Sequence, residues 1–204
     1  MKLNQLFEMP LHIDGDYRPS IKLDSFPSME GLQRENTFLG ELEKSGKVYS
    51  FWLSKNEKAA KVTTKGIDEI GQHRQLVVVR LDFKPAVGLP VDKELCVHTV
   101  YTHEEYRGDF LAGALYIVLA RYGYSVVSDF TQYNGGKALW KKMSREAEMR
   151  KFAIRIWSDE TSDWVKNDQG EVLKYVASNL ADENIWQDIS QHSQPTTLLV
   201  LQTK

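Results

Sequence analysis

One stretch of this chain could bind an anion, because it combines a glycine and an arginine with the predicted start of a helix. The stretch runs from Glu104 to Ala112 and reads EEYRGDFLA. The first turn of a helix carries unpaired N–H groups and the positive end of the helix dipole, which together attract phosphates. Gly108 lets such a group approach the backbone without meeting a Cβ atom, and Arg107 adds positive charge beside it. The alternative is an ordinary turn between a strand and a helix.

Two further positions could take part in proton transfer. His98 lies in a predicted strand over 95–101, and an imidazole exchanges a proton close to neutral pH. Ser128 and Asp129 follow a short apolar strand over 124–127, at the end of the strand where α/β proteins place ligands. Each position has a structural alternative. His98 would then be a half-buried strand residue, and Ser128 with Asp129 would cap a helix.

Strands and helices must position these residues, and the hydrophobic pattern predicts them from residue 48 onward. Apolar and β-branched runs predict strands over 48–53, 59–64, 76–81, 95–101, 124–127, 152–157 and 198–201. Apolar residues at a spacing of four predict an amphipathic helix that starts near Phe110 and stops at Gly123. A second helix, capped by Thr131 or Asn134, runs to about Met149. We interpret residues 10–36 as loop with short strands, and 158–190 as charged loops with a short helix around 182–189.

The order strand, helix, strand, helix, strand predicts an α/β domain with a mixed sheet and flanking helices. A strand–helix–strand unit of this size implies a parallel pair with a right-handed crossover. Residues near 97–101 and 124–128 would form that pair, whereas the hairpin pattern before them implies antiparallel strands. We expect a single domain over residues 1–204, because no repeat or low-complexity linker divides the chain and its length suits one core.

Composition disfavours several classes of partner. The net charge is −2, so no overall field attracts the chain to nucleic acid, and we expect no nucleic-acid partner. The longest apolar stretches are far shorter than the ~20 residues of a membrane span, and Met1–Pro10 lacks the core of a signal peptide. We therefore expect a cytoplasmic protein without a membrane partner. Cys96 is the only cysteine, which excludes an internal disulfide and a thiolate zinc cluster, and we expect no metal. The pattern favours no particular oligomeric state.

The segment from Glu105 to Ala112 resembles the acetyl-CoA signature of the GNAT acyltransferase superfamily, in which Gln or Arg, two residues, Gly, one residue, and Gly or Ala follow each other. The likeness continues downstream, where a helix, Gly123, a short strand and a second helix follow in the family's order. Residues 135–143, which read GGKALWKKM, are similar to a family segment of that second helix. The recognisable core covers about residues 45–157, and 158–204 form a C-terminal extension with a final strand. Residues 128–140 are also similar to a variant found in GNAT-like proteins of bacteriophages.

This resemblance implies a GNAT-like acyl-CoA N-acyltransferase fold and a matching activity. The protein would transfer an acetyl group from acetyl-CoA, or a related acyl group, to an amine-bearing acceptor, either a small molecule or a protein. The cofactor would lie between the strands at 97–101 and 124–128, which diverge in this fold. The residues implied for the pantetheine arm are Thr99, Val100 and Tyr101, and those for the pyrophosphate are Arg107, Gly108, Asp109, Phe110, Leu111 and Ala112. The implied base is Glu94, acting through a water molecule, or His98.

Four residues depart from the family pattern. Glu105 stands where the motif usually begins with Gln or Arg. Phe110 stands where the family has Gly or Ala close to the pyrophosphate, and Asp109 places a carboxylate where the family often has Lys. Trp140 stands where many members have the Tyr that protonates the leaving thiolate, and an indole N–H is not a usable acid. Tyr133, Ser128 or solvent would then supply the proton. These departures favour a second hypothesis, a catalytically degenerate GNAT-fold protein that acts by binding a macromolecular partner.

Overall fold

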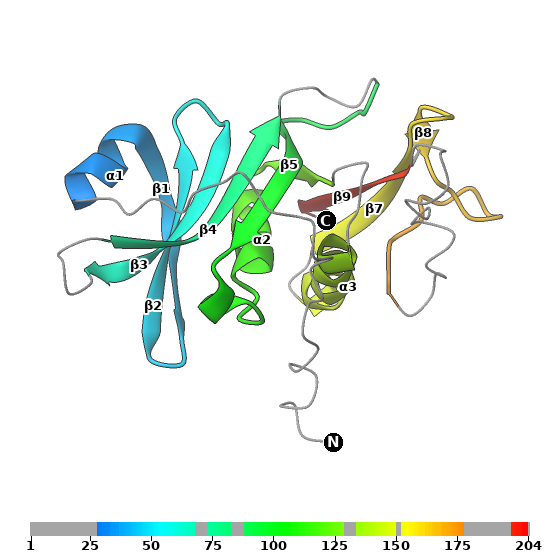
Figure 1. Cartoon of the computed structure of the whole chain (residues 1–204). Helices are drawn as coiled ribbons and strands as arrows, with labels where there is room; N and C mark the ends of the chain where they lie inside the picture. The colour runs from blue at the N-terminus through cyan, green and yellow to red at the C-terminus, as the bar shows by residue number, and fades with distance from the viewer. Residues whose placement is uncertain are drawn as a thin grey trace, which may run out of the picture.

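The computed structural model describes residues 28–67, 73–82, 88–128, 134–149, 152–177 and 197–203. Within these ranges the chain forms three α-helices and one mixed sheet of nine strands, an α+β architecture (Figure 1). The helices are α1 (Met29–Glu35), α2 (Leu111–Arg121) and α3 (Asn134–Met149). The strands are β1 (Asn36–Lys44), β2 (Lys47–Ser54), β3 (Ala59–Ile67), β4 (His73–Asp82), β5 (Glu94–Thr102), β6 (Ser125–Val127), β7 (Phe152–Ser158), β8 (Asp163–Trp164) and β9 (Thr197–Thr203). Their order in the sheet is β1-β2-β3-β4-β5-β6-β9-β7-β8.

The first five strands form an antiparallel meander in which each strand pairs with the next along the chain. The strands predicted before residue 102 are confirmed as β2, β3, β4 and β5. The prediction of loop with short strands up to residue 36 is wrong at its end, where α1 leads directly into β1. Neither element is easy to predict. A seven-residue helix is too short to show a period, and a bulge between Phe38 and Gly40 interrupts the alternation in β1.

β5 and β6 pair in parallel across the α2 crossover, as predicted, and every other pair in the described sheet is antiparallel. The register differs from the expected one. Glu94–Cys96 pairs with Ser125–Val127, so the strands meet at their first residues rather than along 97–101. The cause is the junction before β6, where the Ser125 N–H donates to the Lys93 carbonyl at 3.1 Å and fixes the start of both strands together.

β9 completes the sheet by lying between β6 and β7, antiparallel to both. The predicted strands over 152–157 and 198–201 are confirmed as β7 and β9, and the second predicted helix is confirmed as α3. The helix predicted around 182–189 and the capping residue Thr131 lie outside the described residues.

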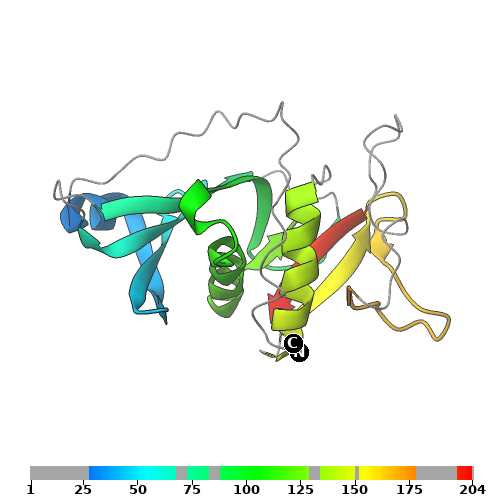
Figure 2. The same cartoon turned by 60° about the horizontal axis from the view of Figure 1, so that its bottom comes forward.

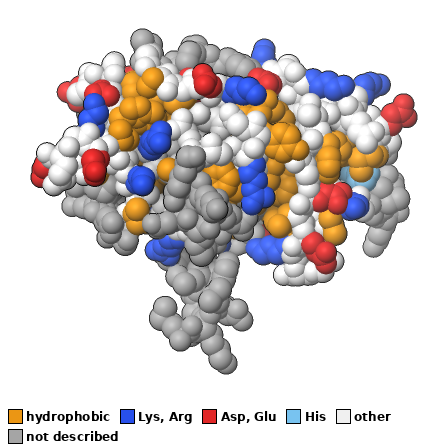
Figure 3. All heavy atoms as spheres, turned by 180° about the vertical axis from the view of Figure 1, so that it is seen from behind, with side chains coloured by type: hydrophobic (Ala, Val, Ile, Leu, Met, Phe, Trp, Pro, Cys, Tyr) orange, Lys and Arg blue, Asp and Glu red, His pale blue; other side chains and the backbone are white. Residues whose placement is uncertain are grey.

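α2 and α3 cover the same face of the sheet (Figure 2). Leu111, Leu115 and Leu119 of α2 are fully buried there, which confirms the predicted apolar stripe, and Trp140 and Met143 of α3 join them. A smaller buried cluster occupies the opposite face and consists of Val127, Trp157, Leu198 and Val200. None of the described helices is both long and apolar enough to cross a membrane. On the face seen in Figure 3, Lys and Arg side chains lie interspersed with Asp and Glu.

A long-range hydrogen bond joins the residue before β6 to the turn between β2 and β3. Tyr124, just before β6, donates its hydroxyl to Glu57 Oε1 in the turn between β2 and β3 at 2.7 Å. Burial, together with the hydrogen bond to Glu57 and the negative charge of that carboxylate, raises the pKa of Tyr124 to about 12. The phenol therefore stays protonated in the folded protein over a pH range in which it ionises in the unfolded chain.

We expect the Tyr124→Phe substitution to lower the free energy of unfolding by about 1 kcal/mol, because it removes this bond. Between the ordinary phenol pKa of 10.0 and about 12 the unfolded chain binds fewer protons than the folded protein, so stability falls as pH rises through this window. The Tyr124→Phe variant should show a smaller fall in the free energy of unfolding over this pH range. Urea unfolding at pH 8, and at about pH 11, measures both effects. The matched control is Tyr122→Phe, at a side chain that is 50% exposed; if the two variants behave alike, the bond contributes nothing.

Candidate functional site

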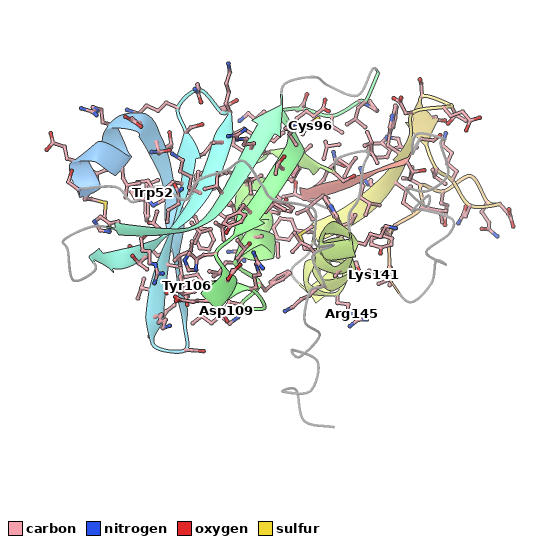
Figure 4. The ribbon with its side chains drawn as sticks, viewed as in Figure 1. Trp52, Cys96, Tyr106, Asp109, Lys141 and Arg145 are labelled. Carbon is pink, nitrogen blue, oxygen red and sulfur yellow. The ribbon has the colours of Figure 1, made fainter. Side chains whose placement is uncertain are left out.

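The candidate site begins where β5 and β6 part. β6 pairs with β5 only at Glu94–Cys96, whereas β5 continues to Thr102 in partnership with β4 alone. From Val97 to Thr102, no described strand pairs with the side of β5 that faces away from β4, and we call this stretch the open edge. Figure 4 shows Cys96 at one end of β5, and Tyr106 and Asp109 beyond its other end. The open edge therefore runs from the point where the strands part to the loop before α2.

A bulge at His98 determines which backbone groups face the open edge. Val97 lies opposite Leu81 and Thr99 lies opposite Arg80, so His98 is one extra residue in β5. A bulge shifts the alternation of the strand by one position. The shift leaves the His98 side chain exposed, and His98 is therefore not the half-buried strand residue of the structural alternative.

One hydrogen bond shows which residues of β5 bond to β4 after the bulge and which face the open edge. His103 donates its N–H to the Leu76 carbonyl at 2.8 Å, directly beyond the β4–β5 ladder. Bonded and non-bonded pairs alternate in an antiparallel ladder, so Thr99 and Tyr101 bond to β4. Val100 and Thr102 consequently turn their N–H and C=O groups toward the open edge.

Of the three residues predicted to hold a pantetheine arm, Val100 alone presents its backbone at the open edge. Thr99 and Tyr101 are directed to β4 by the ladder. Thr102 was missed by the sequence analysis, and its carbonyl accepts a bond from Arg107 Nε at 3.3 Å. No sequence signal could have distinguished these residues, because the bulge at His98 decides the phase and lies in an otherwise regular strand pattern.

The loop from β5 to α2 ends at a helix start without a side-chain cap. After a 3-10 turn at Glu104–Tyr106, Gly108 adopts φ 99° and Phe110 adopts φ 61° immediately before α2. The first intrahelical bond runs from the Ala114 N–H to the Phe110 carbonyl at 2.9 Å. The N–H groups of residues 111–113 thus have no acceptor among the described residues, which is the condition for holding an anion at a helix N-terminus.

The Phe110 ring lies against the first turn of α2. A Cβ atom built on Gly113 would come within 2.2 Å of Phe110 Cε2, and the ring packs against the main core. Lys142 of α3 places its ammonium 4.9 Å from the centroid of the same ring. The glycine at 113 therefore makes room for the ring, and Lys142 brings a positive charge close to the start of α2. The sequence analysis did not single out Lys142.

Two loop residues predicted to contact a pyrophosphate already have partners. Arg107 lies over the Tyr101 ring, with its guanidinium carbon 6.0 Å from the centroid, in addition to its bond to the Thr102 carbonyl. The Asp109 carboxylate lies 3.9 Å from the Lys44 ammonium. Arg107 thus occupies the corner between the open edge and the loop, and the charge of Asp109 is partly compensated by Lys44.

Two of the residues predicted to transfer protons, Glu94 and Ser128, border the paired rows of β5 and β6. Glu94 is half-buried, and its Oε1 accepts a bond from Cys96 Sγ at 2.8 Å, so the carboxylate reaches toward the last paired row. Ser128 follows β6 and is buried; its Oγ accepts the Leu199 N–H at 2.9 Å, and its hydroxyl hydrogen can still be donated. Tyr133 lies outside the described residues.

Trp140 plays no part in this arrangement. Its indole is buried and lies 5.9 Å, centroid to centroid, from the ring of Tyr116. Within the described ranges, no three His, Cys, Asp or Glu side chains are grouped as metal ligands would be. The arrangement as a whole offers backbone hydrogen bonds along an extended edge, an anion position at its end, and a carboxylate and an imidazole near its start.

No protein-family model matches the chain, and comparison with characterised proteins and with solved structures finds no significant match.

The contact between Phe110 and Gly113 predicts that the Gly113→Ala substitution changes stability in a direction that depends on the residue at position 110. Gly113→Ala should destabilise the protein by about 1–3 kcal/mol, because the new methyl group collides with the ring. In a Phe110→Ala background the same change should be neutral or stabilising by up to about 1 kcal/mol, since Ala favours a helix over Gly. Urea unfolding of the four proteins measures the cycle. Equal effects in both backgrounds would mean that the ring does not rest on Gly113.

Proposed function

We propose that this protein is a GNAT-like acyltransferase that transfers an acetyl group from acetyl-CoA, or a related acyl group, to an amine. The observation that carries the proposal is the open edge of β5, which leads from Glu94–Cys96 into the uncapped N-terminus of α2. An extended ligand with amide groups in its arm and phosphates at its end matches this sequence of partners. The order of the strands, with one parallel pair in an otherwise antiparallel sheet, supports the same conclusion.

The cofactor would bind through backbone groups and positive charge. Val100 and Thr102 would pair with the amides of the pantetheine arm, as a neighbouring strand would. The N–H groups of residues 111–113 would hold the pyrophosphate, and Lys142 would add charge beside it.

The reaction needs an amine, a base and a donor for the leaving thiolate. The amine nitrogen attacks the thioester carbonyl carbon, the C–S bond breaks, and the amine gives up one proton. We assign the base to Glu94, because its half-buried carboxylate accepts a bond from Cys96, the last residue of β5 that pairs with β6. The Ser128 hydroxyl lies on the opposite strand and could donate to the thiolate. Cys96, the only cysteine of the chain, forms no internal disulfide, which suits the reducing cytoplasm that we propose as the location.

Binding of acetyl-CoA tests the proposal directly. At 100 times its Kd the cofactor should stabilise the fold by about 2.7 kcal/mol, which corresponds to a rise in Tm of roughly 5–11 °C for a chain of this size. Lys142→Glu should weaken binding by about tenfold, because it reverses a charge near the phosphates. Lys137→Glu makes the same change on another face of α3 and should leave binding unaltered. If millimolar acetyl-CoA leaves the melting temperature of the folded protein unchanged, the enzyme proposal fails in favour of a binding protein of the same fold.

Catalysis is tested by the release of CoA from acetyl-CoA in the presence of a panel of primary amines, including polyamines and lysine peptides. Glu94→Gln should lower kcat by about 100-fold or more, since it removes the base, without weakening the binding of acetyl-CoA. Asp92→Asn, at an exposed carboxylate just before β5, is the matched control. A loss of activity in His98→Asn, with Glu94→Gln unaffected, would instead assign the base to His98.

A further inference from the structure

The hairpin of β1 and β2 reaches the loop before α2 from a distant part of the sequence. Lys44, the last residue of β1, donates its ammonium to the backbone carbonyl of Asp109 at 2.6 Å. The same ammonium lies 3.9 Å from Asp109 Oδ1. One side chain therefore fixes the backbone of the loop and also compensates the charge of its carboxylate. Asp109 is the residue whose charge would oppose a phosphate at the start of α2.

Aromatic side chains support the same contact. The Tyr106 ring meets the Tyr49 ring edge-on at 6.4 Å and the His103 ring at 6.0 Å, and Lys47 lies 5.3 Å from its centroid. Burial raises the pKa of Tyr49, and the carboxylate of Asp109 raises it further, as expected for a phenol near that charge. Tyr49 and Lys47 belong to β2, so both strands of the hairpin contact the loop.

β4 secures the beginning of the loop. Arg74 donates to Glu105 Oε2 at 3.1 Å, and its second terminal nitrogen lies 3.1 Å from His103 Nε2. The loop is therefore held at its start by β4 and at its end by β1 and β2. Neither hairpin strand is adjacent to the loop along the chain, because β3, β4 and β5 lie between them.

We propose that Lys44 is a positioning residue of the cofactor site, acting through Asp109. By holding the Asp109 carbonyl it keeps the loop in the conformation that leaves the N–H groups of residues 111–113 available. By compensating the Asp109 carboxylate it permits a phosphate to bind beside an acidic residue. The inference deepens the proposed function and rests on it for the identity of the ligand; the structural role of Lys44 stands independently of that identity.

The test is a double-mutant cycle with CoA as the probe, measured by calorimetric titration of the full chain. Lys44→Met should weaken CoA binding by about tenfold, because it leaves the carboxylate uncompensated. Asp109→Asn should strengthen binding severalfold, and the double variant should bind within about threefold of the wild type. Lys44→Arg should retain binding. Lys55→Met, which removes an exposed positive charge from the turn after β2 without contacting the loop, is the control and should change affinity by less than about twofold.

Amide hydrogen exchange of the unliganded proteins provides a second readout. Lys44→Met should speed exchange in residues 103–114 while leaving β7 and β9 protected. Unchanged affinity and unchanged exchange in Lys44→Met, or strictly additive effects in the cycle, would overturn the inference. If the wild type binds no CoA, the proposed function and the phosphate role of Lys44 both fail, and faster exchange would then establish Lys44 only as a residue that fixes the loop.

Discussion

The parallel pairing of β5 with β6 ends after Cys96, and the candidate site depends on this limit. β6 is three residues long, and the next residue, Ser128, bonds to Leu199 of β9 through both its N–H and its Oγ. The residue after β6 therefore bonds to β9 instead of extending the pairing with β5, while β5 continues along β4. The N–H and C=O groups of Val100 and the N–H group of Thr102 are left without a strand partner, whereas the Thr102 carbonyl accepts a bond from Arg107. In the proposed function an extended ligand with amide groups pairs with this edge as a further strand would.

The same arrangement accounts for the residues that depart from the GNAT signature. Phe110 occupies a left-handed conformation that favours glycine, and its ring is accommodated because residue 113 is a glycine. The carboxylate of Asp109 is accompanied by Lys44. Both unusual residues therefore have a matching partner elsewhere in the chain, Phe110 in the first turn of α2 and Asp109 in the β1–β2 hairpin.

Local sequence patterns predicted most of the framework and little of the site's detail. The run 76–81 and the stripe of leucines in α2 follow from β-branched content and a period of 3.6 residues, and both are confirmed. The register of β5 against β6 and the bulge at His98 depend on tertiary contacts and leave no local signal. Lys44 is separated from Asp109 by 65 positions, so its contact could not be predicted without the pairing of five strands. Glu94 and His98 lie on β5, before and after the last row that pairs with β6, and Ser128 directly follows β6; their proposed roles remain predictions.

Amide exchange along β5, resolved residue by residue with NMR, tests the central claim that its open edge receives the cofactor. In the free protein the N–H groups of Thr99 and Tyr101 should be protected by β4, and those of Val100 and Thr102 should exchange faster. Saturating acetyl-CoA should slow exchange at Val100 and Thr102 and leave Thr99 and Tyr101 unchanged. Protection of all four in the free protein, or no change at Val100 and Thr102 when acetyl-CoA binds, would contradict the account.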